Sequence, residues 1–322
     1  MRAYASVGIL ICGLLDAQAV QVQKRAKSEG AIRGAASTRD GGVFTWGDQL
    51  VRWKLPSLEP QVLAKGHFSE GGCLVDLDSD GQAEFVAKEG SGLGRLTWRK
   101  PPYTEPVVID QQVDTHDCLE ATLFGRKGLL TIHRHMQVRF YERNATGAWP
   151  YREIYSIYTP SQQSGLSLRD VDGDGFIDII CGNYWIQSPA RFDLPWHIFA
   201  INTYFEQPLS AMLAHAFFED ALFVAQSHVS PARVALFRKP ADPKQLWIEQ
   251  RLGGDLDLHR VHGVAVWKGT LFFGENNGPA SRTFALRNGS LEKVMEGVDV
   301  LKLLPTKSGM LSAGPGELVL WR

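Results

Sequence analysis

Two short stretches of the chain carry aspartates at alternate positions and end in glycine. They read DLDSDG at residues 76–81 and DVDGDG at residues 170–175. Alternate carboxylates in a tight loop can converge on one point, and hard oxygen ligands suit Ca²⁺, which takes roughly six to eight of them. Glycine allows the sharp turn that such a loop needs. We therefore predict two calcium sites. Metal-free Asp/Gly turns are the alternative, because these residues also form such turns readily.

The two loops offer equivalent ligands: aspartates, a backbone carbonyl and a last acidic side chain. The predicted ligands of the first loop are Asp76, Asp78, Asp80, the carbonyl of Gln82, and Glu84. Those of the second loop are Asp170, Asp172, Asp174, the carbonyl of Phe176, and Asp178. A loop saturated by protein oxygens leaves little room for a substrate, so we predict that both ions are structural rather than catalytic.

The elements that must position these loops are short strands. Apolar runs precede and follow each loop, so neither loop is flanked by the helices of an EF-hand. The strand–turn–strand pattern returns at Leu74, Leu119, Leu168, Phe217 and Ala265, which are 45, 49, 49 and 48 residues apart. Two further strand-like runs usually follow each pair. Four short strands per unit of this length are typical of β-propeller blades.

We predict an all-β fold, a seven-bladed β-propeller of four-stranded antiparallel blades, with six or eight blades as alternatives. An earlier unit fills residues 31–65, and three strands follow Gly297. The missing fourth strand is expected from residues 20–27, which would close the ring and remove its exposed edges. No Pro/Ser-rich linker interrupts the period, so residues 20–322 form one predicted domain. The best short helical pattern lies at residues 208–215.

The units with acidic loops resemble the FG-GAP/VCBS repeat family, the calcium-loop propellers that also form the head of integrin α chains. The resemblance covers residues 71–87 and 164–182, and the other units share only the period. It implies a calcium ion in the turn between the first two strands of these two blades. The third, fifth and sixth units have LFGRKG, FFEDA and VWKGT at this turn, so we expect no metal there.

Other polar residues map to the opposite face of the propeller, at entries to first strands and in turns after second strands. The candidate catalytic residues are His116, His259 and His262. The candidate ligand-binding residues are Asn183, Tyr184, Trp185, His228, Glu275, Asn276 and Asn277, and His133 and His135 also map there. Histidine can transfer protons near neutral pH or ligate a transition metal. Aromatic and amide side chains suit a carbohydrate. Polar turn residues without a function are the alternative.

Two functions fit such a face. We favour a binding module for a polysaccharide or protein ligand. The alternative is a sugar-processing enzyme of the lyase or dehydratase type, with a His-lined metal or acid/base site at the central channel. PWHIFAI (195–201) and LHRVHG (258–263) resemble the propellers of aldos-2-ulose dehydratase-type enzymes, which would add a transition metal. Convergence of the three candidate histidines on one point would favour the enzyme. A purely scaffolding role is the third possibility.

Composition and the N-terminal residues bound the environment of the protein. Lys and Arg number 34 and Asp and Glu 35, a balance that argues against binding of nucleic acid. Arg2, an apolar run and Ala17-Gln18-Ala19 predict a signal peptide at residues 1–19 and a secreted or periplasmic chain. No later segment has the length and apolarity of a transmembrane helix. We expect the mature chain to be a soluble monomer.

Cysteines remain at positions 73, 118 and 181 after the predicted cleavage. Each lies in an apolar strand-like run, and their number is odd. We predict buried free thiols rather than a disulfide. Their spacing does not match that of zinc ligands.

Overall fold

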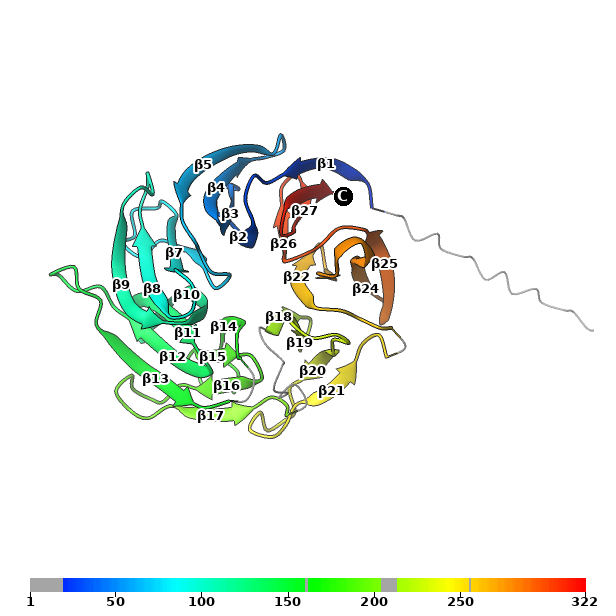
Figure 1. The fold of residues 1–322 in the computed structure, drawn as a ribbon. Helices are drawn as coiled ribbons and strands as arrows, with labels where there is room; N and C mark the ends of the chain where they lie inside the picture. Colours follow the sequence, from blue (N-terminus) through cyan, green and yellow to red (C-terminus); the bar gives the residue numbers. More distant parts are fainter. Residues whose placement is uncertain (1–19, 160–161, 204–212, 255) are drawn as a thin grey trace, which may run out of the picture.

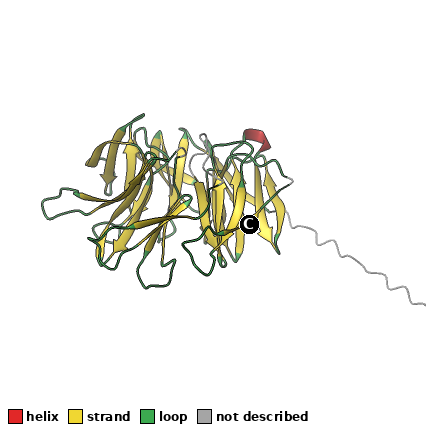
Figure 2. Cartoon of the chain, turned by 90° about the horizontal axis from the view of Figure 1, so that it is seen from below, coloured by secondary structure: helices red, strands yellow, loops and turns green. Residues whose placement is uncertain are grey.

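Short strands, many of them buried on both faces, make up almost all of this structure, a computed structural model. It describes residues 20–159, 162–203, 213–254 and 256–322. In these residues the strands β1 to β28 form seven four-stranded antiparallel sheets. Figures 1 and 2 show the sheets arranged as blades around a central axis. The predicted seven-bladed β-propeller is confirmed.

The first six blades each use four consecutive strands, and the first strand of each lies nearest the axis (Figure 1). Blade 1 contains β2 (Ile32–Ser37), β3 (Val43–Gly47), β4 (Gln49–Lys54) and β5 (Glu59–Lys65), and blade 2 contains β6 (Cys73–Val75), β7 (Glu84–Glu89), β8 (Gly94–Arg99) and β9 (Pro106–Val113). Blade 3 contains β10 (Thr115–Leu123), β11 (Arg126–His133), β12 (Met136–Tyr141) and β13 (Tyr151–Ile157), and blade 4 contains β14 (Leu166–Arg169), β15 (Asp178–Cys181), β16 (Tyr184–Gln187) and β17 (His197–Ala200). Blade 5 contains β18 (Leu213–Phe218), β19 (Ala221–Gln226), β20 (Val234–Arg238) and β21 (Ile248–Arg251), and blade 6 contains β22 (Val261–Trp267), β23 (Thr270–Glu275), β24 (Arg282–Arg287) and β25 (Ser290–Glu296).

Blade 7 combines strands from both ends of the described chain. Its inner strands are β26 (Lys302–Thr306), β27 (Gly309–Ala313) and β28 (Glu317–Trp321). The outer strand, β1 (Val22–Lys27), pairs antiparallel with β28, and Arg25 lies opposite Val319. The predicted closure of the ring by residues 20–27 is confirmed.

The short helix suggested at residues 208–215 is wrong for the part that the structure describes. Residues 208–212 lie outside the described residues, and the remainder begins β18, which pairs in register with β19. Pairing with a neighbouring strand outweighs a short local preference for helix. In the described residues the one helix is the 3₁₀ turn η1 (Gly278–Ala280), and no helix there is long and apolar enough to cross a membrane. The predicted signal peptide also lies outside the described residues.

The core lies between neighbouring blades. In β3, β15, β19 and β27 every residue is buried, because the adjacent blades cover both faces of each strand. Such strands are apolar throughout instead of alternating between apolar and polar residues. Aromatic side chains join the blades: Trp98 of blade 2 and Trp149 of blade 3 have ring centroids 5.4 Å apart.

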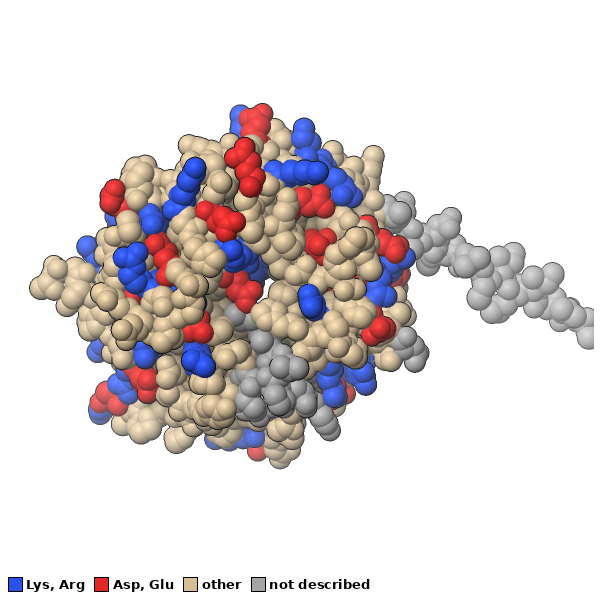
Figure 3. All heavy atoms as spheres, viewed as in Figure 1, with Lys and Arg blue, Asp and Glu red and all other residues tan. Residues whose placement is uncertain are grey.

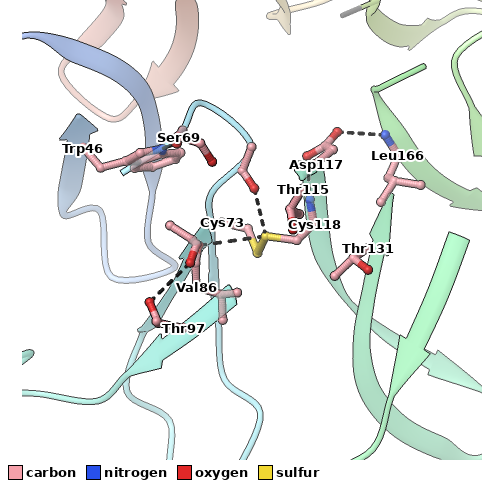
Figure 4. Close-up of a disulfide and its surroundings, with 12 residues drawn as sticks. Trp46, Ser69, Cys73, Val86, Thr97, Thr115, Asp117, Cys118, Thr131 and Leu166 are labelled. Atoms are coloured by element: carbon pink, nitrogen blue, oxygen red, sulfur yellow. Dashed lines mark hydrogen bonds between the residues drawn. A yellow bond between two sulfur atoms is a disulfide. The ribbon is translucent and has the colours of Figure 1, made fainter. Parts of the chain in front are cut away.

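A disulfide links the inner strands of blades 2 and 3 (Figure 4). Cys73 in β6 and Cys118 in β10 are bonded, with Cα atoms 5.7 Å apart. The prediction of free thiols is therefore wrong for this pair, and it is confirmed for Cys181, which is buried and free. The separation of 45 residues equals one repeat, so the two cysteines occupy the same position in adjacent inner strands.

Candidate functional site

The two acidic loops have the same pattern of hydrogen bonds. The first loop joins β6 to β7 and the second joins β14 to β15. In each, the last acidic side chain accepts a hydrogen bond from a loop amide: Leu77 N to Glu84 Oε2 is 2.9 Å, and Val171 N to Asp178 Oδ2 is 3.0 Å. Three further amide-to-carboxylate bonds recur at matching positions: Gly81 to Asp76 and Gly175 to Asp170, Asp80 to Asp78 and Asp174 to Asp172, and Gln82 to Asp80 and Phe176 to Asp174.

This backbone arrangement gathers the aspartates of each loop. One carboxylate oxygen from each of the three lies within 4.8 Å of the others, both for Asp76, Asp78 and Asp80 and for Asp170, Asp172 and Asp174. In the first loop, Asp76 Oδ1 and Glu84 Oε1 are buried and have no hydrogen-bond partner among the described residues. An all-oxygen donor set with buried oxygens left over fits the ligand preference of Ca²⁺.

The last acidic residue of each loop is the most buried donor. Burial raises the pKa of Glu84 to about 7 and the pKa of Asp178 to about 6. A cation held by the neighbouring carboxylates would favour the ionised form of both side chains. The donor sets of the two loops therefore fit calcium, and the chemistry such an ion supplies there is charge neutralisation within a turn.

One neighbour differs between the loops. Lys100 follows β8 opposite Glu84, and its ammonium contacts the carboxylate of Asp78. At the matching position beside the second loop is Gln187, whose Nε2 donates to Asp172 Oδ2 at 2.5 Å. The first loop therefore has a protein cation beside its carboxylates, whereas a neutral amide stands at that position in the second.

On the face of the propeller opposite the acidic loops, β-bulges place side chains near the axis. The first ladders of blades 1, 3 and 6 each have an irregularity where the inner strand begins. The residues at these bulges are Arg33, His116 and His262, and all three line one cavity of about 240 Å³, the inner cavity. A bulge re-aims a side chain. The same local feature in three blades thus brings a guanidinium and two imidazoles to one space.

A cluster on the same face of the propeller consists of Glu70, His228 and His262. One ligand atom from each lies within 4.8 Å of the others. His228 Nε2 is 3.6 Å from Glu70 Oε1, and the rings of His228 and His262 have centroids 4.9 Å apart. Glu70 precedes blade 2, His228 follows β19 of blade 5, and His262 belongs to β22 of blade 6. Since blades 5 and 6 lie across the ring from blade 2, the cluster spans the axis.

The histidines of the inner cavity are neutral near pH 7. Burial lowers the pKa of His262 to about 3 and also lowers the pKa of His116. Both ring nitrogens of His116 are buried without a hydrogen-bond partner among the described residues, and Asp114 Oδ2 lies 3.7 Å from Nε2. A neutral imidazole has a free lone pair, which can accept a proton or bind a metal.

A more open cavity of about 600 Å³, the outer cavity, begins at the same cluster. It shares Arg33, Glu70 and His262 with the inner cavity and adds Lys88 and Arg260. The full lining is Ile32, Arg33, His67, Ser69, Glu70, Lys88, Gly90, Ser91, Gly92, His228, Arg260, His262, Asn276, Leu301 and Pro315. Basic side chains therefore outnumber acidic ones. On the face seen in Figure 3, charged side chains of both signs lie close to the centre of the ring.

The three candidate catalytic histidines do not converge on one point. His116 and His262 line the inner cavity, and His259 is not among its lining residues. His259 Nε2 lies 3.3 Å from Asp257, and its backbone amide donates to Glu275 at 2.8 Å. His133 is also structural, because its side chain lies in the core and only 2% of the residue is exposed.

Several candidate ligand-binding residues are buried. Asn183, Trp185 and Glu275 are fully buried, so they present no surface to a ligand in this structure. Trp185 stacks on Phe199 with ring centroids 4.9 Å apart, and Glu275 Oε2 accepts a hydrogen bond from Arg282 Nε at 2.7 Å. Glu275 ends β23, the second strand of blade 6, and Trp185 belongs to β16, so these side chains pack between blades, and sequence position alone does not distinguish such a place from a surface turn.

The remaining candidates lie in three places: the core, the start of η1 and the outer cavity. Tyr184 is half-buried and packs against the core between blades 3 and 4. Asn277 precedes η1, and its amide donates to Ser281 at 2.6 Å. His228 and Asn276 line the outer cavity.

Sequence reasoning did not select Glu70 or Arg33. Extending the repeat to the first unit would have placed Arg33 at the bulge position of His116 and His262, because its ladder has the same irregularity. Glu70 has no comparable signal, since it comes from an irregular segment before blade 2.

Comparisons with known proteins bear on the fold. No protein-family model matches the chain, and a search of the curated proteins gives no match. Among solved structures, the chain is similar to YCF48 from Cyanidioschyzon merolae, with a TM-score of 0.60 and 10% sequence identity. The similarity covers 92% of this chain and 98% of that chain. At this identity the likeness supports the propeller fold and nothing finer.

Proposed function

We propose that the protein is an exported, calcium-stabilised propeller that binds an acidic polysaccharide at the outer cavity, on the face opposite the calcium loops. The observation that carries this proposal is the chemistry of the outer cavity. Its volume of about 600 Å³ falls within the range of ligand sites, and Arg33, Lys88 and Arg260 face a single acidic residue, Glu70. Basic side chains grouped around a cavity suit carboxylate groups.

Unpaired hydrogen-bond donors of the basic residues support an anionic ligand. Arg33 Nη1 is buried and has no hydrogen-bond partner among the described residues. Arg260 is exposed at the rim of the outer cavity. Two of the basic residues already have an acidic partner: Arg33 Nη2 lies 2.9 Å from Asp48 Oδ1, and Lys88 Nζ lies 2.7 Å from Asp114 Oδ1. A carboxylate in the outer cavity would therefore pair with Arg260 and with the unpartnered Nη1 of Arg33.

Export and calcium binding are supported by separate features. The Cys73–Cys118 disulfide suits an oxidising compartment, consistent with the predicted signal peptide. The matched hydrogen bonds of the two acidic loops and their all-oxygen donor sets support a structural ion in each. These loops are also the part of the chain that carries the resemblance to the FG-GAP/VCBS repeats.

The test is calorimetric titration of the calcium-loaded mature chain with a short oligogalacturonate. We expect binding, and an Arg260→Ala variant should bind at least about tenfold more weakly, because a hydrogen bond to a charged group contributes about 1.5–3 kcal/mol. Arg251→Ala, a change on the outer strand of blade 5, is the matched control and should bind normally. Equal binding of a neutral oligoglucoside, or no binding of either sugar, would contradict the proposal. Binding of oligoglutamate alone would favour a protein ligand.

One observation favours an enzyme as the second candidate. His116 is a neutral imidazole without a hydrogen-bond partner among the described residues, and it faces the inner cavity together with Lys302. A neutral imidazole can act as a general base. In a lyase, such a base removes the proton on the carbon next to the sugar carboxylate, a C=C bond forms as the glycosidic C–O bond breaks, and the leaving oxygen takes up a proton from water. Ultraviolet absorbance of an unsaturated product, absent in His116→Ala, would support this activity. Binding without product would leave the binding module.

A further inference from the structure

We propose that Glu70, His228 and His262 bind one divalent transition-metal ion, with Zn²⁺ as the probe, at the centre of the ring. This site is separate from the acidic loops, and it does not depend on the proposed polysaccharide. It would join blade 2 to blades 5 and 6 across the axis and leave a coordination position open.

The positions of the ligand atoms fit a metal after small side-chain movements. One atom of each residue lies within 4.8 Å of the others, and His228 Nε2 is 3.6 Å from Glu70 Oε1. Ligand atoms on a tetrahedral zinc ion lie about 3.3 Å apart, given bonds of about 2.0–2.1 Å. Rotation of the exposed His228 ring and the half-buried Glu70 side chain can supply the difference.

The types of ligand atom select the class of metal. Two imidazoles and one carboxylate suit zinc and other first-row transition metals, whereas calcium and magnesium prefer oxygen ligands. Three protein ligands with a fourth position open to water or a substrate are also the usual composition of a catalytic zinc site. The acidic loops have only oxygen donors, so the two kinds of site should discriminate between metals.

The three ligand residues come from different blades, and backbone hydrogen bonds hold the segments that carry Glu70 and His228. The segment before Glu70 is held between blades 1 and 2: Ser69 N donates to Lys88 O at 2.9 Å, and Trp46 Nε1 donates to Ser69 O at 3.0 Å (Figure 4). The turn that carries His228 is bonded to blade 6 through Arg260 N and Val229 O, 3.0 Å apart.

His262 occupies the bulge of β22 and lines both cavities. A bulge commonly re-aims a side chain near a functional site. The three ligands are thus converged by the scaffold, and a metal held by them is adjacent to the inner cavity that contains His116.

The site predicts stoichiometric zinc binding by the full mature chain. We would titrate Zn²⁺ against a chromophoric chelator in excess Ca²⁺, so that the acidic loops are saturated with calcium. The expected result is one zinc ion per chain with a dissociation constant below micromolar. Co²⁺ bound at the same site should give the visible absorption of nitrogen-ligated cobalt, a readout that needs no enzyme activity or sugar.

Variants identify the ligands. His228→Ala and His262→Ala should each weaken zinc binding by at least about 100-fold, since even outer-shell changes cost roughly 10- to 100-fold. Asp170→Asn and His197→Ala, a change at an exposed histidine of blade 4, should leave zinc binding unchanged. His228 is exposed, so its variant serves if His262→Ala fails to fold. Absence of stoichiometric zinc, or zinc binding that survives both histidine changes, would overturn the proposal. Oligogalacturonate binding is measured separately, so failure of one proposal does not imply failure of the other.

Discussion

At the scale of single residues, a histidine can be structural even when it lies near a functional face. His133 ends β11, and its ring nitrogens lie within hydrogen-bonding distance of hydroxyls of Thr115, Thr131 and Tyr141, at 3.1, 2.9 and 3.2 Å. Burial lowers the pKa of His133 to about 3. The ring is therefore neutral in the folded protein and becomes protonated on unfolding below its ordinary pKa.

The pH dependence of stability should reveal this histidine. Because the folded pKa is lowered, the unfolded chain binds more protons at acidic pH, and the free energy of unfolding falls as the pH drops below about 6.5. Between about pH 6.5 and pH 5, His133 should contribute roughly 1–2 kcal/mol of this loss. A His133→Gln variant should be less stable at neutral pH but lose less stability on acidification. Urea unfolding at several pH values measures the difference, and parallel profiles for the two proteins would contradict it.

At the scale of elements, two loops with one hydrogen-bond pattern differ in their charge. The ammonium of Lys100 contacts Asp78 and lies 3.8 Å from Asp80 and 4.0 Å from Glu84. The second loop has the neutral Gln187 at that position, and a lysine of blade 5, Lys239, donates to the Val171 carbonyl at 2.6 Å instead of to a carboxylate. If each loop binds calcium, as we propose, Lys100 competes with the ion in the first loop, and the second loop should bind calcium more tightly.

Exchanging these two side chains should exchange the affinities. A positive charge about 4 Å away repels a bound cation even in a water-like dielectric, so Lys100→Gln should tighten calcium binding at the first loop by about fivefold. The reciprocal Gln187→Lys should weaken binding at the second loop. Calorimetry in an Asp170→Asn background isolates the first loop, and an Asp76→Asn background isolates the second. Unchanged affinities in both would show that Lys100 does not oppose the ion.

Repetition explains which elements could be predicted from the sequence. A repeat of 45 to 49 residues between anchors such as Leu74 and Leu119 gave the strands, the blade number and the phase of the acidic loops. The disulfide could also have been predicted from the sequence, because Cys73 and Cys118 each stand one residue before such an anchor. The place of Glu70 in the cluster could not be predicted from the sequence, because contacts across the axis join blades that are far apart in the chain.

At the scale of the whole molecule, stability depends on closing the ring. β1 is largely exposed, and its ladder runs from Val22 opposite Trp321 to Lys27 opposite Glu317. The backbone of β28 is covered on its outer side by this strand. Without β1, blade 7 would present an unpaired edge, which is a template for pairing with another chain.

A shortened mature chain should therefore be less stable and should no longer remain a monomer. We expect a protein that begins at residue 28 to melt at a lower temperature than one that begins at residue 20, and to form dimers or larger species as its concentration rises. The loss of side-chain burial is small because most of β1 is exposed, so the main effect should come from the unpaired backbone of β28. Size-exclusion chromatography with light scattering gives the mass, and a Lys24→Pro variant of the longer chain disturbs the same ladder without removing residues. Two proteins with equal melting temperatures and equal monomer masses would show that β1 does not protect this edge.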